Sequence, residues 1–334
     1  MNNRSALART IPSTRALRPR ISVVVPAFNE ATNLPALLGA LTSVLGGLTD
    51  QWEVVVVDDG SRDATAVAML SWLVQPGVRY LRLSRNFGKE CALTAGIEYA
   101  QGEVVVCMDA DLQHPVEMIA PMLERWRDGV DMVCATRATR ADETLSKRLG
   151  TWLFYRLVNT NSVMQIPVDA GDFRLMDRCV VDALKSLPER NRFMKGLFAW
   201  VGFRNEILPY TPNERASGKS SFSIRGLARL AFTGVTSFSN FPLRLWSALG
   251  AIIALGALLL GLWIVFEHFF EAQAVPGWAT LAVSMLFFSG VQLLSIGILG
   301  EYVGRIFDEV KQRPIYIVAL ERGRSCFTDE AATP

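Results

Sequence analysis

Several patterns that define common protein classes are missing from this 334-residue sequence. It has no GxxxxGK[ST] loop, which excludes a P-loop nucleotide hydrolase, and no GxGxxG follows its first predicted strand, which argues against a dinucleotide enzyme. Its five cysteines form no CxxC pair, and we interpret them as reduced thiols of a protein that faces a reducing compartment. The net charge is only +2, so the charge balance gives no indication of a nucleic-acid partner.

The first twenty residues carry five arginines and no acid. They have no apolar core segment, so they do not form a secretory signal. An organelle transit peptide is the alternative, but an abrupt strand pattern begins at Ile21 and the leader has no apolar face. We therefore expect residues 1–20 to be a disordered basic tail.

Half of the residues are hydrophobic, and the excess concentrates after residue 240. Segment 224–242 is apolar but interrupted by arginines, which favours helices that lie in a membrane interface. Two charge-free runs follow, 245–266 and 278–300, and about 20 apolar residues suffice to cross a bilayer. A buried hairpin of a soluble protein is the alternative, which two consecutive runs of this length disfavour. We expect residues 243–303 to form a transmembrane hairpin.

Basic residues flank this hairpin on both sides, whereas its connecting loop has none. By the positive-inside rule both ends then lie in the cytoplasm. The bulk of the chain and the C-terminal segment 304–334 are therefore expected on the cytoplasmic face.

Short apolar strands alternate with helical segments from Ile21 to about Arg137. This α/β pattern is typical of a mostly parallel, Rossmann-like sheet covered by helices on both faces, in a domain that we place at 21–223. Ligands of such sheets bind outside the carboxyl ends of the strands. The predicted strands are Ile21–Val25, Glu53–Val57, Val78–Leu83, Glu103–Met108 and Met132–Ala135, with Phe173–Met176 and Arg204–Tyr210 further along.

Acidic residues follow three of these strands, in the segments PAFNE (26–30), DDGS (58–61) and DADLQHP (109–115). Converging carboxylates repel one another unless a cation lies between them. An Asp-x-Asp pattern after a strand suits a hard octahedral cation, Mg²⁺ or Mn²⁺, that also holds phosphate oxygens. The pattern therefore predicts a metal site that binds a diphosphate.

The order PxxNE, DDGS, RNFGKE, DADLQHP and DxGDFRL resembles the GT-A glycosyltransferases of family 2. It is most similar to the branch that includes dolichol-phosphate mannose synthases and bacterial undecaprenyl-phosphate glucosyltransferases. The resemblance extends from about Ile21 to Leu320. It implies inverting transfer of a sugar, glucose or a related hexose, from a UDP- or GDP-sugar to polyprenyl phosphate. It also implies a multi-pass protein of a bacterial inner membrane with its catalytic domain in the cytoplasm.

The resemblance also implies roles for individual residues on the donor side. Asp109 and Asp111 would face the metal, and Gln113 would add a ligand. The alternative role for Asp59 is that of a turn residue that caps the next helix. His114 is expected to position the loop that contains it. The residues expected to bind the nucleotide-sugar are Pro26, Asn29, Glu30, Asp58, Asp59, Lys89, Asp109 and Ala110.

A second constellation, DAGDFR at 169–174, would line the sugar and the acceptor. An acceptor phosphate is largely ionised near neutral pH, so Asp169 or Asp172 would orient it or take a residual proton. Ser220 lies in a loop where this chain reads GKSSF and many family members have GxSK[WY], so the lysine that binds phosphate stays open. For Lys147 and Arg148 a solvated helix face is the alternative. The expected phosphate-binding cations are Arg137, Lys147, Arg148, Arg174 and Arg215.

Three other functions remain as alternatives. A processive polysaccharide synthase would carry QxxRW, which this chain lacks. A non-catalytic scaffold of the same shape predicts eroded acids at the strand ends, and a transferase to a hydroxyl would need Asp172 as an obligatory base. Neighbouring protomers could support the hairpin, which is compatible with a homo-oligomer.

Overall fold

The computed structural model describes residues 15–137, 171–190, 192–211 and 277–327, together with scattered positions between 250 and 266. The chain divides into two compact units. The first contains the sheet and, in addition to the N-terminal part, includes Pro314–Pro334; the second includes Ser223–Arg313.

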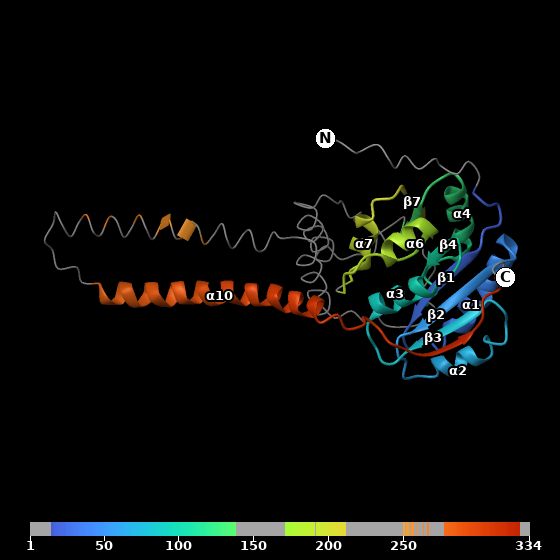
Figure 1. The fold of residues 1–334 in the computed structure, drawn as a ribbon, viewed down its shortest axis with the longest axis horizontal. Coiled ribbons are helices and arrows are strands. Elements are labelled where there is room, and N and C mark those ends of the chain that lie inside the picture. Colours follow the sequence, from blue (N-terminus) through green and yellow to red (C-terminus); the bar gives the residue numbers. More distant parts are fainter. Residues whose placement is uncertain are drawn as a thin grey trace, which may run out of the picture. The chain divides into compact units, whose positions relative to one another are not determined.

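An eight-stranded mixed sheet forms the centre of the first unit, in the order β7-β5-β6-β4-β1-β2-β3-β8 (Figure 1). Its middle strands, β4, β1, β2 and β3, are parallel, as the sequence predicted. β6 and β8 run antiparallel to their neighbours, and β5 is parallel to β7. The strands are β1 (Ile21–Ala27), β2 (Trp52–Asp58), β3 (Val78–Leu83), β4 (Val104–Cys107), β5 (Met132–Arg137), β6 (Arg174–Asp177), β7 (Asn205–Tyr210) and β8 (Val318–Gly323).

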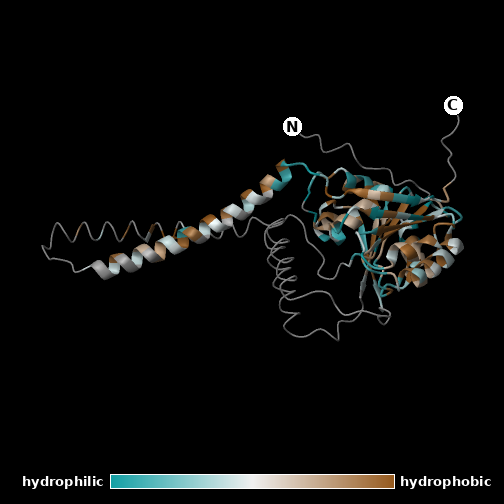
Figure 2. Cartoon of the chain, turned by 90° about the horizontal axis from the view of Figure 1, so that it is seen from below, coloured by the Kyte–Doolittle hydropathy of each residue, from teal (hydrophilic) through white to brown (hydrophobic). Residues whose placement is uncertain are grey.

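Helices cover both faces of this sheet, because the central strands are apolar on both sides. Val23 and Val25 share a buried cluster with α1 (Leu34–Leu48), α2 (Thr65–Leu70), the short 3₁₀ helix η1 (Val116–Met118) and α4 (Ile119–Arg127). Val55 and Val57 pack on the opposite face against α3 (Lys89–Tyr99). The helices α6 (Arg178–Lys185) and α7 (Met194–Trp200) follow β6. Figure 2 shows the strands mainly in the hydrophobic colour.

The close approach of α3 to the sheet depends on Gly96. A Cβ atom at this position would lie 2.1 Å from Cγ1 of Val24 on β1. Glycine therefore lets the helix axis come nearer to the strands than any side chain would allow.

The strand β8 comes from the C-terminal segment, beyond the boundary at residue 223 that we expected for the catalytic domain. It pairs antiparallel with β3, with Leu81 opposite Glu321. The buried Arg79 links the two strands, because its guanidinium donates to Glu321 (2.8 Å) and to the fully buried Glu53 (2.9 Å). The catalytic sheet therefore includes residues on both sides of the predicted hairpin in sequence.

Part of the N-terminal leader is anchored to the first unit. The guanidinium of Arg15 donates to the carbonyl of Val130 (2.6 Å) and to Asp131 (2.8 Å), and lies 5.0 Å from the ring centroid of Trp126. The expectation of a disordered tail is therefore wrong from Arg15 onward, and residues 1–14 lie outside the described residues.

In the second unit, α10 (Trp278–Val310) is 33 residues long, and it begins at the residue where the second predicted span begins. Within the described residues it is the one helix long and apolar enough to cross a membrane, by length and composition. Many of its large apolar side chains are exposed, among them Leu281, Met285 and Leu293. Figure 2 shows the hydrophilic colour gathering at its C-terminal end. The first predicted span, 245–266, lies mostly outside the described residues and is not confirmed.

Candidate active site

The carboxyl ends of β1, β2 and β4 bring the three acidic loops to one edge of the sheet. Ala27, the last residue of β1, lies opposite Asp58, the last residue of β2. The N–H of Asp59 donates to the carbonyl of Ala27 (2.9 Å), and the N–H of Met108 donates to that of Val24 (3.1 Å). The PAFNE, DDGS and DADLQHP segments therefore start from neighbouring strands.

The ionisation of Glu30 reflects how close the acids are. Burial raises the pKa of Glu30 above its ordinary value, a hydrogen bond from the Asn33 amide (2.6 Å) lowers it, and the charges of Asp111 and Asp109 raise it again. A divalent cation near the two aspartates would remove this repulsion.

The loop after β4 holds Asp109 and Asp111 in place through its own backbone. The N–H of Gln113 donates to Asp111 Oδ1 (3.1 Å), and the N–H of Asp109 donates to Nδ1 of His114 (3.3 Å). Leu112, between Asp111 and Gln113, has a φ of 61°, a left-handed conformation that leucine rarely adopts. The loop is therefore strained immediately after the two aspartates.

His114 positions this loop, as the sequence analysis expected. Its ring stacks on Phe173, with centroids 4.9 Å apart, and meets the edge of Tyr210 at 5.9 Å. His114 is itself 7% exposed, and its Nδ1 is the acceptor for Asp109, which leaves the ring proton on the other nitrogen. The hydrogen bond at Nδ1 and the packing of the ring together make His114 a residue that positions the loop.

The donor atoms fit a hard cation only in part. Asp109 and Asp111 offer carboxylate oxygens, and the described residues contain no group of three or more His, Cys, Asp or Glu side chains arranged to hold a metal. Mg²⁺ and Mn²⁺ accept one or two carboxylates when substrate phosphates and waters complete the coordination. The chain therefore suits a cation that arrives with a diphosphate.

Asp58 is entirely buried, and both of its oxygens accept hydrogen bonds from the chain. Oδ1 accepts from the N–H of Ser61 (2.7 Å) and Oδ2 from the hydroxyl of Tyr80. Burial and the charge of Asp58 raise the pKa of Tyr80, so its phenol stays protonated and keeps donating. Asp58 thus ties the DDGS turn to β3.

Asp59 anchors the RNFGK loop instead of capping a helix. Its carboxylate accepts from the N–H groups of Phe87 (2.7 Å) and Gly88 (2.9 Å). Gly60 next to it has a φ of 68°, and a Cβ there would lie 2.5 Å from the backbone of Arg85. The alternative of a helix cap for Asp59 is therefore wrong, and DDGS and RNFGK form one joined surface.

Three further residues of the predicted nucleotide side occupy the first and third loops. Pro26 lies in β1 opposite Val57, and Ala110 is 3% exposed. Asn29 has a φ of 58°, and its side-chain oxygen accepts from the N–H of Arg62 (2.9 Å). Asparagine tolerates this left-handed conformation, so it turns the chain sharply after β1.

Lys89 joins the two acidic constellations. Its ammonium lies 2.6 Å from Asp109 Oδ1 and 2.6 Å from Asp172 Oδ2. Burial alone would lower the pKa of Lys89, but the two carboxylates outweigh it and raise that pKa above its usual value. For Asp172 burial opposes ionisation, yet Lys89 and Lys195 lower its pKa to about 2. Asp172 is therefore a permanent anion near neutral pH.

Glu90 is the neighbouring acid with the opposite behaviour. Burial and the charge of Asp172 raise the pKa of Glu90 to about 7, although the N–H of Met194 donates to its carboxylate (3.1 Å). Glu90 lies in the quoted RNFGKE motif, but it was not assigned a role from the sequence. Lys195 was noted only as part of a loop that could influence donor choice. Neither residue has a spacing that marks it as functional.

Arg174 does not lie where a phosphate could reach it. It is 2% exposed, its guanidinium lies 3.6 Å from the ring centroid of Phe198, and it donates to the carbonyl of Gly171 (2.5 Å). The expectation that Arg174 binds the acceptor phosphate is therefore wrong, because the aromatic ring covers it. Arg137 ends β5 opposite Tyr210. The remaining predicted residues, Asp169, Lys147, Arg148, Arg215 and Ser220, lie outside the described residues.

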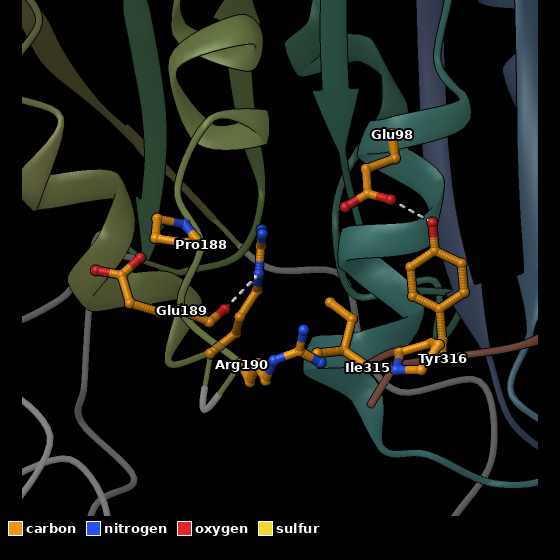
Figure 3. Close-up of a pocket in the computed structure, with 8 residues that line it drawn as sticks. Glu98, Pro188, Glu189, Arg190, Ile315 and Tyr316 are labelled. Atoms are coloured by element: carbon orange, nitrogen blue, oxygen red, sulfur yellow. Dashed lines mark hydrogen bonds between the residues drawn. The ribbon is translucent and has the colours of Figure 1, made fainter. Parts of the chain in front are cut away.

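A cavity of about 360 Å³ lies elsewhere on the first unit (Figure 3). On one side the hydroxyl of Tyr316 donates to Glu98 of α3, and on the other Arg192 donates to the carbonyl of Glu189 (3.1 Å). Glu98 is nine residues along α3 from Lys89, roughly 13 Å at 1.5 Å per residue. The cavity contains none of the predicted site residues.

The chain resembles known proteins over most of its length. Residues 22–184 match the family model "Glycosyl transferase family 2". A glycosyltransferase of Synechocystis sp. is 44% identical over 90% of this chain and 94% of its own length. The SfII prophage-derived bactoprenol glucosyl transferase of Shigella flexneri is 44% identical over 90% of this chain and 97% of its own. The solved glucosyl-3-phosphoglycerate synthase of Mycobacterium tuberculosis is 21% identical, covering 64% of this chain and 75% of its own, with a TM-score of 0.45.

Proposed function

The chain belongs to glycosyltransferase family 2, and from this premise we propose that it transfers a hexose from a nucleotide-sugar to a polyprenyl phosphate at a membrane surface. The observation that carries the proposal is the Lys89 bridge between Asp109 of the donor side and Asp172 of the acceptor side. The similarity to bactoprenol glucosyl transferases over nine-tenths of the chain supports a lipid phosphate as acceptor and glucose as the sugar.

The donor would bind along the joined loops at the carboxyl edge of the sheet. Pro26, Asn29 and Glu30 with the Asp58–Asp59 turn shape the nucleoside side, and Asp109, Ala110 and Asp111 face the diphosphate. Asp109 and Asp111, with Gln113 as a third metal ligand, would hold Mg²⁺ or Mn²⁺. The cation would neutralise the charge of the departing diphosphate. Lys89 adds a cation at the same edge.

The reaction we propose is a direct displacement that inverts the anomeric carbon. A phosphate oxygen of the acceptor forms the new bond as the bond from the anomeric carbon to the nucleoside diphosphate breaks. An ionised acceptor phosphate needs no strong base. Asp172, with a pKa of about 2, is a poor proton acceptor and a good orienting anion. Among the described residues its Oδ1 has no hydrogen-bond partner, which leaves the carboxylate an unused acceptor.

The low pKa of Asp172 weighs against a hydroxyl group as the acceptor. A sugar or protein hydroxyl must lose its proton during attack, and a base is most effective when its pKa lies near the working pH. Asp172 is far below that range in this structure. A lipid phosphate is therefore the better match for the site. The exposed apolar side chains of α10 support a bilayer as the surrounding of the second unit, with the catalytic unit on the cytoplasmic face.

A radiolabel assay tests this function. Membranes that contain the full chain are incubated with labelled UDP-glucose and other UDP- or GDP-hexoses, together with undecaprenyl phosphate, and lipid-linked sugar is extracted. We expect product from one donor, loss of product with EDTA, and loss in Asp111→Ala. The control is Asp50→Ala, an acid whose side chain is 81% exposed, which should retain activity. No product from any donor, or full activity in Asp111→Ala, would contradict the proposal.

A further inference from the structure

The first turns of α3 and α7 are fastened together beside Asp172. The carboxylate of Glu90 accepts a hydrogen bond from the N–H of Met194, the first residue of α7 (3.1 Å). The hydroxyl of Thr94, one turn further along α3, lies 3.6 Å from the sulfur of Met194. The position of α7 along α3 is therefore fixed by contacts at its first residue.

The other end of α7 fixes which of its faces points to the DAGDFR segment. Phe198 packs on the guanidinium of Arg174, at 3.6 Å, two residues after Asp172. Lys195 precedes Phe198 by three positions and so shares its face of the helix. Lys195 is thus directed to the Asp172 end of the segment, and its positive charge contributes to the low pKa of Asp172.

Among the described residues, Lys195 is a cation beside Asp172 that forms no close ion pair. It is half-buried, and among the described residues no carboxylate lies within 4 Å of its ammonium. Lys89 is shared between Asp109 and Asp172, and Arg174 is covered by Phe198. An anionic substrate that approaches Asp172 needs a cation beside it, because the negative charges of the substrate and of Asp172 would otherwise repel each other.

We propose that Lys195 binds the phosphate group of the acceptor, and that Glu90 is the positioning residue that places it there. This inference rests on the proposed function. The shared chemistry is that of a phosphate group, and both the acceptor phosphate and the donor diphosphate contain it. The position beside Asp172, a residue expected on the acceptor side, favours the acceptor.

Binding and kinetics together test the role of Lys195. The full chain in detergent is titrated with a short-chain, water-soluble polyprenyl monophosphate and with the corresponding alcohol. In Lys195→Ala we expect binding of the monophosphate to weaken about 10- to 100-fold, as for loss of a charge-assisted hydrogen bond. KM for the acceptor should rise by a similar factor, and KM for the nucleotide-sugar should stay within about threefold. Lys195→Arg should recover most of the affinity, and Lys185→Ala on α6 is the matched control.

The outcomes separate this inference from the proposed function. Unchanged monophosphate affinity in Lys195→Ala overturns the inference, and so does a wild-type chain that binds alcohol and monophosphate equally. A loss confined to the nucleotide-sugar assigns Lys195 to the donor and also overturns it. If the wild-type chain transfers no sugar, the proposed function fails, whereas the monophosphate titration still decides whether Lys195 is a phosphate ligand.

Two substitutions test the role of Glu90, one that keeps a hydrogen-bond acceptor at this position and one that removes it. Glu90→Gln keeps an oxygen that accepts from Met194, whereas Glu90→Ala removes it. We expect Glu90→Ala to raise acceptor KM about tenfold with little change for the donor, and Glu90→Gln to remain near wild type. Equal effects of the two variants, or an equal rise in both KM values, would show that Glu90 does not act by positioning α7.

Discussion

His114 holds the Asp109 loop through a hydrogen bond on one side and aromatic packing on the other. We predict that His114→Ala lowers the rate of lipid-linked sugar formation about 10- to 100-fold, because the loop loses the acceptor for the Asp109 N–H. His114→Asn, whose side-chain oxygen can replace Nδ1, should recover part of the rate. Initial rates at saturating metal measure both variants. Equal losses in Ala and Asn would mean that packing, and not the hydrogen bond, orders the loop.

The raised pKa of Glu90 predicts that the stability of the folded protein depends on pH. Its pKa rises from an ordinary 4.5 to about 7 in the folded chain, mainly through burial and then through Asp172. The folded protein therefore keeps a proton that the unfolded chain releases above about pH 4.5, so this contribution to stability falls as the pH rises from there to 7. Thermal unfolding of wild type and Glu90→Gln at pH 5 and pH 8 should show the wild type losing more. Parallel pH profiles of the two proteins would contradict the assignment.

Helix α3 packs so closely on the sheet that one added methyl group should lower the stability of the catalytic unit. We predict that Gly96→Ala destabilises the catalytic unit by about 1–3 kcal/mol, because its Cβ would overlap the Val24 side chain. Gly46→Ala in α1 is the matched control, since nothing lies within 4 Å of a Cβ there. That control should be neutral or stabilising by up to about 1 kcal/mol, the difference in helix propensity. Chemical denaturation of both variants in the same detergent decides the point.

The order of the loops at the carboxyl edge could be predicted from the sequence, whereas part of the sheet could not. Apolar runs followed by Asp58 or Asp109 are local signals, and the parallel strands that they end lie side by side. The apolar run 315–320 leads into β8, but it follows the second predicted span and was not singled out as a strand, and β8 is exposed along most of its length. Its place depends on pairing with β3, more than 200 residues earlier, for which no local pattern exists.

The same limit applies to Arg174 and Lys195. A cation within the DAGDFR motif was expected to bind phosphate, but Phe198, 24 residues later in the sequence, covers Arg174. Lys195 comes near Asp172 only because α7 is fastened to α3 at Met194. Contacts between helices that are distant in sequence decide which cation is available, and spacing within one motif does not contain that information.

At the scale of the whole molecule, α10 gives the second unit many exposed large apolar side chains. Its 33 residues span about 50 Å at 1.5 Å per residue, more than the roughly 30 Å of a bilayer core. We predict that Leu293→Lys, at a side chain that is 70% exposed, costs about 2.5–3.5 kcal/mol of membrane insertion. The fraction of protein that resists an alkaline carbonate wash of the membranes should fall. Val310→Lys at the helix end is the control and should stay in the pellet.

The position of β8 in the sheet has a consequence for how the protein is made. A ribosome releases β1 to β7 first, then α10, and only afterwards β8, the strand that covers the β3 edge. Domains generally fold as units during synthesis, but this sheet stays one strand short until α10 has left the ribosome. Maturation of the catalytic unit therefore follows translation of α10, so chains that stop before β8 are left with an uncovered sheet edge.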